Sequence, residues 1–293
     1  MATPAQWIEG ARPRTLPAAV APVIAGSGAA SYAGSFVWWK ATLALVVAVA
    51  LQVAVNYAND YSDGIRGTDS NRVGPFRLVG SQAAAPAAVR RAAFAGFAVA
   101  AAAGLVLAAT TAWWLVLVGA AAIAASWYYT GGSMPYGYRG LGELSVFVFF
   151  GLVAVMGTAY VQTQSFTVPA AVSGVGVGAL ACAILVANNL RDIPTDRLAG
   201  KRTLAVAIGD PGTRRLYVGL TAAAFLAMVA VVLHIGADWW LLTVALPSLA
   251  LSIRAARSVL ADATGLDLIP VLRDTGLAEL LYGVALAFLL TTA

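Results

Sequence analysis

Long runs of apolar residues, separated by short polar connections, dominate this sequence. They occur nine times, and each approaches the roughly 20 residues that an α-helix needs to cross the hydrocarbon core of a membrane. The runs are continuous rather than alternating, which favours helices over the strands of a membrane β-barrel. The segments are 16–34, 38–57, 89–109, 113–130, 141–162, 170–190, 216–235, 239–255 and 275–292.

The composition supports a membrane protein. Hydrophobic residues make up 60% of the chain and charged residues only 11%, too few to cover a water-facing surface. We therefore predict an all-α, polytopic membrane protein with nine transmembrane helices in a single domain, 1–293. The first residues lack the pattern of a cleaved signal peptide, so the first segment is expected to be retained. Cys182 is the only cysteine, which excludes an intrachain disulfide.

The basic residues predict an orientation. With the segments taken in order, 17 of the 18 Lys and Arg residues fall on one side and only Lys40 falls on the other. The basic side is expected to be cytoplasmic, which puts the N-terminus inside and the C-terminus outside. This distribution accounts for the net charge of +5 without a nucleic-acid partner.

A partial internal repeat lies in two long connections on the basic side. The spacing Asn-x₃-Asp occurs at Asn56 and Asp60 and again at Asn188 and Asp192, 132 residues further on. Each copy stands where an even-numbered segment reaches the basic side, so the repeats near 56–69 and 188–201 are expected to face each other across the bundle.

Each copy predicts a cluster of oxygen atoms. On a helix, Asn56, Asp60 and Asp63 fall within an arc of about 60°. Asn188 and Asp192 share a face in the same way, whereas Pro194 is expected to disturb the turn that leads to Asp196. Carboxylate and amide oxygens suit Mg²⁺, which commonly joins carboxylates to substrate phosphates. A solvated helix cap is the alternative, but a cap needs only one such residue.

Basic and aromatic residues accompany the aspartates. Cationic side chains near the motifs could neutralise a diphosphate, although the positive-inside rule also accounts for them; they are Arg66, Arg72, Arg77, Arg191 and Lys201. A metal-bound diphosphate at the mouth of an apolar bundle implies a substrate with a long apolar tail. Its ionisation gives a carbocation that aromatic faces can stabilise, and the candidates are Tyr128, Tyr129, Tyr136 and Tyr138, which are equally suited to an interfacial aromatic belt.

Four strings resemble the UbiA superfamily of intramembrane prenyltransferases, and within it the branch that acts on 1,4-dihydroxy-2-naphthoate in menaquinone biosynthesis. They are RPRTLP at 12–17, NYANDYSDGIRGTD at 56–69, PYGYRGLGE at 135–143 and NNLRDIPTDRLAGKRTL at 188–204. The paired aspartate motifs point to the superfamily, and the other strings point to the branch.

The resemblance implies a nine-helix bundle with a central cavity in a bacterial plasma membrane, with its site on the cytoplasmic side. It implies Mg²⁺ bound by Asp60, Asp63, Asp192 and Asp196, together with Asn56 and Asn188. The implied reaction joins the prenyl group of a polyprenyl diphosphate to the ring carbon that bears the carboxylate, with loss of CO₂. Arg139 is implied at the diphosphate, and Arg14 is a candidate acceptor contact. Glu143 is a candidate base or acceptor contact, with capping of a helix end as the alternative. Met134 stands where the family often has Lys or Arg.

Two alternatives remain open from the sequence. Another UbiA-type acceptor, such as 4-hydroxybenzoate, homogentisate or haem, fits the same motifs, because ordinary apolar residues would line the cavity. A transporter would also contain acidic residues, but normally near the bilayer midplane, whereas these stand at the ends of the predicted spans.

Overall fold

The computed structural model describes residues 2–67 and 76–293, and within that part it contains helices and no strand. The all-α prediction is confirmed. The main helices are α1 (Pro4–Gly10), α2 (Pro17–Tyr32), α3 (Trp38–Arg66), α4 (Pro86–Ala109), α5 (Leu115–Tyr128), α6 (Gly142–Val146), α7 (Ala154–Thr163), α8 (Val168–Leu198), α9 (Leu204–Ile235), α10 (Leu246–Leu260) and α11 (Leu268–Thr292). Shorter helical segments are η1 (Pro13–Thr15), η2 (Tyr136–Arg139), η3 (Phe147–Val153), η4 (Trp239–Ala245) and η5 (Gly265–Asp267).

Seven helices in the described residues are long and apolar enough to cross a membrane. They are α3, α4, α8, α9 and three continuous units, Gly142–Thr163, Trp239–Leu260 and Gly265–Thr292. Helices α2 and α5 have 16 and 14 residues, fewer than the roughly 20 needed for a full crossing. The prediction of nine transmembrane helices is therefore supported for seven of them.

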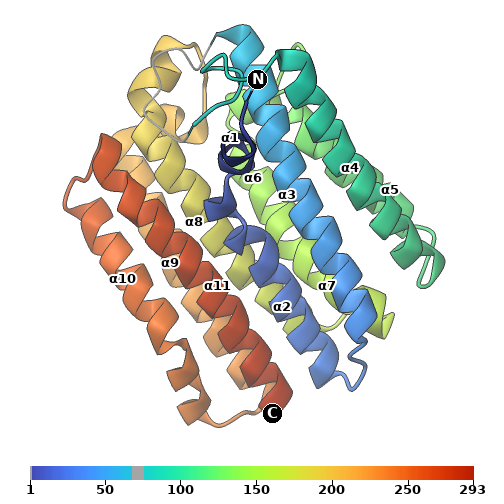
Figure 1. The fold of residues 1–293 in the computed structure, drawn as a ribbon. Coiled ribbons are helices and arrows are strands. Elements are labelled where there is room, and N and C mark those ends of the chain that lie inside the picture. Colours follow the sequence, from blue (N-terminus) through green and yellow to red (C-terminus); the bar gives the residue numbers. More distant parts are fainter. Residues whose placement is uncertain (1, 68–75) are drawn as a thin grey trace.

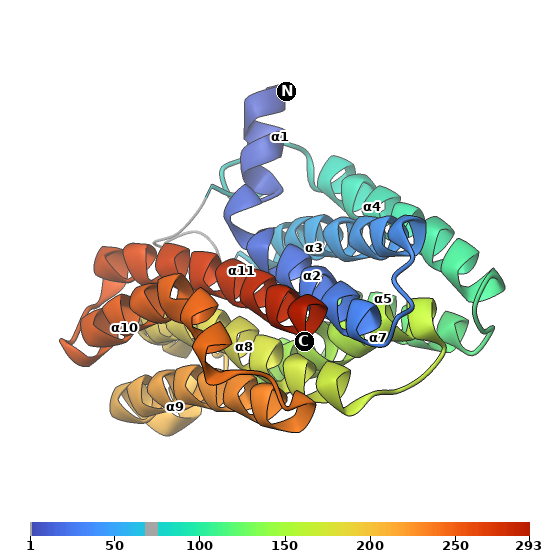
Figure 2. The same ribbon diagram turned by 90° about the horizontal axis from the view of Figure 1, so that it is seen from below.

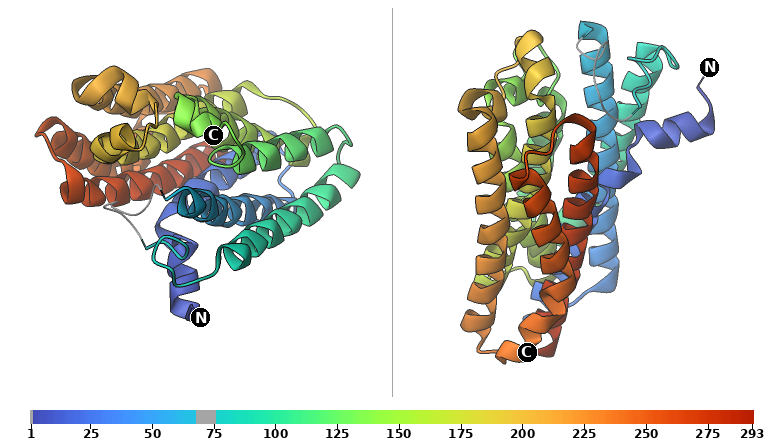
Figure 3. Two further views of the ribbon diagram at one scale, coloured as in Figure 1. Left: turned by 90° about the horizontal axis from the view of Figure 1, so that it is seen from above. Right: turned by 90° about the vertical axis from the view of Figure 1, so that its left-hand side faces the viewer.

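The helices form one bundle whose long members run side by side (Figures 1 and 2). The short α1 stands away from the bundle, as Figure 3 shows. Helices α3 and α8 both finish at the end of the bundle opposite the C-terminus (Figure 1). Large apolar side chains such as Leu117 and Leu226 are exposed on the outside, as expected where lipid replaces water.

Both helices that carry the Asn-x₃-Asp motifs extend beyond the predicted apolar segments. Helix α3 has 29 residues and continues to Arg66, and α8 has 31 residues and continues to Leu198. The expected disturbance at Pro194 is wrong, because the helix runs through this residue. Proline inside a helix loses one backbone hydrogen bond and crowds the carbonyl four residues earlier, but its φ suits a helix, and α8 continues through Pro194 for about one more turn, to Leu198. The motifs therefore project from helices rather than from loops.

The unit that runs from α6 through η3 to α7 packs closely against the backbone of α8. The π-helical segment η3 interrupts the unit from α6 to α7, and a Cβ atom on its Gly151 would lie 2.6 Å from the carbonyl oxygen of Gly174 and 2.6 Å from Cα of Gly178. Only glycine allows this approach. The contact holds the start of α6 beside α8, close to the second motif.

Lys40 lies at the other end of the bundle and is buried. Its Nζ donates hydrogen bonds to the carbonyl oxygens of Thr110 (3.2 Å) and Val161 (2.7 Å) and to Oγ1 of Thr111 (3.0 Å). An ammonium group is favourable near helix C-termini, so Lys40 joins the start of α3 to the ends of α4 and α7.

Candidate active site

The last turns of α3 present Asn56, Asp60 and Asp63, all of them buried. Asn56 supports the chain before α2: its Nδ2 donates to the carbonyl oxygen of Ala11 (2.9 Å) and to Oγ1 of Thr15 (3.0 Å). The predicted ligand Asn56 therefore also fixes the segment between α1 and α2 against α3.

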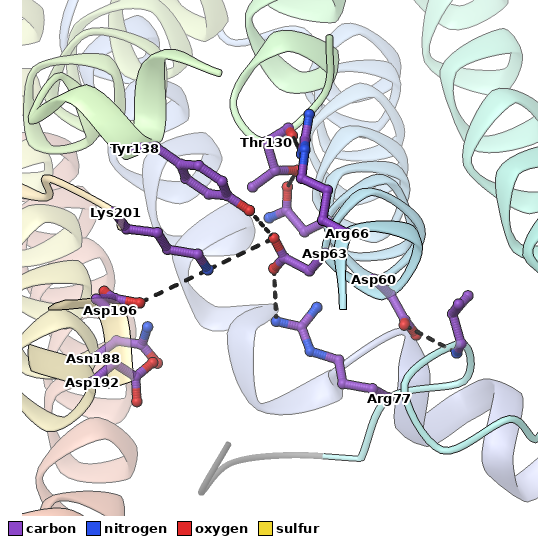
Figure 4. Close-up of polar contacts among 12 residues, drawn as sticks. Asp60, Asp63, Arg66, Arg77, Thr130, Tyr138, Asn188, Asp192, Asp196 and Lys201 are labelled. Atoms are coloured by element: carbon purple, nitrogen blue, oxygen red, sulfur yellow. Dashed lines mark hydrogen bonds and ion pairs between the residues drawn. The ribbon is translucent and has the colours of Figure 1, made fainter. Parts of the chain in front are cut away.

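Asp60 points away from the second motif (Figure 4). Its two oxygens accept hydrogen bonds from the backbone N–H groups of Leu78 (2.7 Å) and Val79 (3.1 Å). Only 1% of Asp60 is exposed, so these bonds are shielded from water. Asp60 thus holds in place the segment that carries Arg77.

Asp63 is the meeting point of several groups from distant parts of the chain (Figure 4). The hydroxyl of Tyr138 donates to its Oδ1. Arg77 Nη2 lies 3.6 Å from Oδ2, and Lys201 Nζ lies 3.8 Å from Oδ1. Tyr138 is held in turn by a backbone bond of 2.8 Å from the Arg202 N–H to its carbonyl oxygen. Three separate segments therefore converge on one carboxylate at the end of α3.

The second motif lies on the facing end of α8. Arg191 Nε and Nη2 donate to the two oxygens of Asp192 (2.7 and 3.0 Å), and Nη2 also donates to Asn188 Oδ1 (2.8 Å). Lys201 Nζ lies 3.8 Å from Asp196 Oδ1, the same distance as from Asp63. One ammonium group therefore lies between carboxylates of α3 and α8, and the structure brings Asp63 and Asp196 together as parts of one polar site.

The other predicted residues are divided between this site and the surface. Arg66 donates to the carbonyl oxygens of Thr130 and Gly132 and lies over the ring of Tyr138, 5.6 Å from its centroid. Arg14, Tyr128 and Arg139 are exposed. Arg72 lies outside the described residues.

Tyr136 and Tyr129 pack together behind Tyr138, with their ring centroids 5.5 Å apart. The Tyr136 hydroxyl donates to the carbonyl oxygen of Ala125 (2.8 Å) and lies 2.8 Å from Oγ of Ser145. Burial raises the pKa of the Tyr136 phenol, while the bond to Ser145 lowers it. Tyr129 is within electrostatic reach of Glu143, Asp63 and Asp196. The tyrosine pair therefore joins η2 and the end of α5 to α6, beside the polar site.

Sequence reasoning missed Asn59 and Asn189. Asn59 Oδ1 accepts a hydrogen bond from Thr130 Oγ1 (2.7 Å), and Asn189 Nδ2 donates to Glu143 Oε1 (2.9 Å). Each stands beside a predicted residue but off the Asn-x₃-Asp face. Their partners are distant in sequence, so only the tertiary fold reveals these roles.

The donor set suits Mg²⁺ in kind. Among the described residues, no three His, Cys, Asp or Glu side chains gather into a ready metal cluster. However, Asp63 and Asp196 are buried and share one cation, so the gap between their oxygens is at most twice the 3.8 Å separation from Lys201. Buried, converging carboxylates that already share a positive charge fit the oxygen-rich coordination of a divalent cation.

Substitution of Asp60 by Asn is expected to lower kcat/KM of the reaction at this site by about 10- to 100-fold, because small displacements of binding groups are costly. The amide oxygen can accept one backbone N–H, but its NH₂ group faces the other, so the segment carrying Arg77 shifts. A double-mutant cycle with Arg77→Met measures this coupling. If Asp60 acts through Arg77, the double variant is no slower than R77M. Additive losses would instead favour direct metal binding by Asp60.

The sequence is similar to known proteins over most of its length. Residues 19–265 match the model of the UbiA prenyltransferase family. The 1,4-dihydroxy-2-naphthoate octaprenyltransferase of Mycobacterium tuberculosis is 58% identical over 287 residues, 98% of this chain and 97% of that protein. The Escherichia coli protein of the same name is 36% identical and covers 92% of this chain and 89% of its own length.

Solved structures agree in fold. A UbiA homologue from Archaeoglobus fulgidus bound to GPP and Mg²⁺ superposes with a TM-score of 0.71 at 16% identity, covering 98% of this chain and 100% of that chain. An apo UbiA homologue from Aeropyrum pernix K1 gives a TM-score of 0.73 at 18% identity, with 92% and 96% covered. The apolar helices define a multi-pass helical membrane protein. The ends of α3 and α8 give it one polar site that contains both carboxylates and basic groups. The chain belongs to the UbiA prenyltransferase family.

Proposed function

We propose that this chain transfers a polyprenyl group from polyprenyl diphosphate to 1,4-dihydroxy-2-naphthoate, with loss of CO₂, to give demethylmenaquinone after oxidation. Relatives that are 56% to 58% identical over nearly the whole chain are 1,4-dihydroxy-2-naphthoate octaprenyltransferases by name, which supports the acceptor. The observation that carries the chemistry is the pair Asp63 and Asp196, which belong to different helices and share Lys201.

The polar site suits the diphosphate head group. We assign Mg²⁺ to Asp63, Asp192, Asp196 and Asn188, with Asp60 and Asn56 as further predicted ligands that also hold neighbouring backbone. When bound, Mg²⁺ would neutralise the diphosphate and act as a Lewis acid on its oxygens as the allylic C–O bond breaks. Arg77, Arg191 and Lys201 stand beside the carboxylates and can take up phosphate oxygens through charged hydrogen bonds.

The apolar part of the bundle suits the rest of the substrate. The prenyl tail would lie between helices or in lipid, and the tyrosines behind Tyr138 would face the allylic cation. We propose nine crossings, with the short α2 and α5 completing the seven longer ones, and a central cavity that admits the acceptor. The basic residues favour a cytoplasmic site and N-terminus in a bacterial plasma membrane.

Purified protein assayed with Mg²⁺, one polyprenyl diphosphate and each acceptor in turn tests the proposal. We expect 1,4-dihydroxy-2-naphthoate to be prenylated with release of one CO₂ per product, measured by mass spectrometry and labelled carboxylate. Faster turnover of 4-hydroxybenzoate or homogentisate would overturn the acceptor assignment. A series of diphosphates of different length would give the preferred tail.

A further inference from the structure

Glu143 places a carboxylate with one unused oxygen inside the bundle. It stands in the first turn of α6, and only 9% of it is exposed. Oε1 accepts the hydrogen bond from Asn189, whereas Oε2 is buried and has no hydrogen-bond partner among the described residues. Cys182 Sγ donates to the backbone oxygen of Glu143 (3.1 Å). Two contacts from α8 therefore fix this residue and leave one oxygen available.

The unused oxygen belongs to the surroundings of the polar site. Asn189 is three residues, or about 4.5 Å of helix rise, before Asp192 on α8, which puts Glu143 deeper in the bundle than the aspartates. A Cβ atom on the adjacent Gly142 would lie 3.0 Å from the hydroxyl of Tyr129. That tyrosine is within electrostatic reach of Glu143 and of both Asp63 and Asp196. Glu143 thus lies between the diphosphate region and the apolar interior.

A structural role accounts poorly for this arrangement. A glutamate in a first helical turn commonly serves the helix dipole or caps a backbone N–H. The Glu143 carboxylate lies near its own backbone N–H, but no group of the described residues makes a hydrogen bond to Oε2. A buried acceptor without a partner is costly and uncommon in folded proteins. An unpaired acceptor oxygen at the edge of a site is suited to accept a hydrogen bond from a hydroxyl group of a bound ligand.

We propose that Glu143 takes the proton from a ring hydroxyl of the acceptor and later returns it, with Asn189 as the residue that positions it. This proposal rests on the proposed function. It assigns to Glu143 the one proton that moves in the reaction, and it predicts that the acceptor must carry a hydroxyl next to the carbon that is prenylated.

The chemistry balances without an oxidant. The ring carbon bearing the carboxylate bonds to C1 of the prenyl group as the C1–O bond to the diphosphate breaks. The electrons come from the neighbouring hydroxyl, whose O–H bond breaks and whose proton passes to Oε2 of Glu143, leaving a ketone beside a carbon that bears a carboxylate. Loss of CO₂ then returns an electron pair to that oxygen. The oxygen recovers the proton from Glu143, and the product is the prenylated hydroquinone.

Glu143→Gln tests the proposal because glutamine can still accept from Asn189 but cannot take up the proton. At pH 7 we expect kcat to fall by about 100- to 1,000-fold, the usual contribution of a general base, with KM for the prenyl diphosphate unchanged. The deficit should shrink as the pH rises towards about 10, where a phenol ionises unaided. A merely structural defect would not depend on pH in this way.

Several other titratable groups lie near Glu143, and each of them could contribute to the pH dependence of the rate. They are Tyr129 after α5, Tyr136 in η2, Cys182 in α8, Glu279 in α11 beyond Cys182 and, beyond Tyr129, Asp63 and Asp196. All of them are kept in E143Q, so a change that is specific to this variant reports Glu143.

The matched control is Glu279→Gln on α11. Glu279 is fully buried, and neither of its oxygens has a hydrogen-bond partner in the described part of the chain, but it belongs to none of the site segments. E279Q should stay within about threefold of the parent rate, because a substitution that changes no residue of the polar site acts mainly on stability. If E143Q does not fold, Asn189→Leu is measured instead and should lower kcat about tenfold with KM for the diphosphate unchanged.

The outcomes separate the two proposals. No transfer to dihydroxynaphthoate by the parent protein refutes the proposed function itself. If the parent is active, the role of Glu143 alone is overturned by an E143Q rate within threefold of the parent rate, or by an E143Q deficit that is the same at every pH. Where E143Q does not fold, an N189L rate equal to the parent rate overturns it.

Discussion

Asp63→Asn is expected to lower prenyl transfer by at least about a thousandfold, to the limit of detection. Asp63 is buried and receives the Tyr138 hydroxyl, while Arg77 and Lys201 lie within 3.8 Å. The substitution removes the negative charge that these groups surround and leaves both cations without their shared partner. Breaking a buried charge network from one side is strongly unfavourable. Initial rates with Mg²⁺ and saturating acceptor measure the effect.

The matched control is Asp262→Asn. Asp262 lies beside Arg214, 3.7 Å away, but its side chain is 89% exposed, and its φ of 58° suits asparagine at least as well. We expect D262N to keep the parent rate and thermal stability. Unchanged melting of D63N in detergent would show that its loss is one of chemistry. A D63N rate within tenfold of the parent would refute the central place given to Asp63.

The apolar pattern of the sequence predicts the helices well because each crossing must satisfy its own backbone hydrogen bonds. The Asn-x₃-Asp spacing also predicts the shared faces of α3 and α8, and the structure does bring Asp63 and Asp196 to one cation. The predicted apolar segments are shorter than the helices, because polar residues such as Asp60 and Asp192 end the apolar run. In fact both helices continue beyond the apolar stretch.

Contacts between distant residues could not be predicted in this way. Nothing in the local pattern shows that Asp60 accepts the N–H groups of Leu78 and Val79, or that Glu143 meets Asn189. These pairs depend on where a connection folds back and on how closely η3 approaches α8. Periodicity reports which face of a helix is polar, but it does not report which partner that face meets.

Removal of Mg²⁺ is expected to abolish transfer. The ion pairs of the site also predict how Mg²⁺ and diphosphate affect each other's binding. Asp63 and Asp196 are paired with Lys201, and Asp192 is paired with Arg191. A cation entering alone would have to displace these basic groups from their partners. A diphosphate gives the displaced groups new oxygen partners. Mg²⁺ and diphosphate should therefore bind cooperatively, each weakly by itself.

Thermal unfolding of the purified protein checks this cooperativity without any turnover. Inorganic diphosphate and Mg²⁺, each added alone, should raise the melting temperature little, and together they should raise it by more than the sum. A ligand present at about 100 times its Kd adds roughly 2.7 kcal/mol to the free energy of unfolding, which is a measurable shift. Lys201→Met should weaken the synergy, because the displaced group is gone, while an additive response in the parent protein would contradict the coupling. Such a response would mean that the metal reaches the carboxylates without first separating them from Lys201 and Arg191.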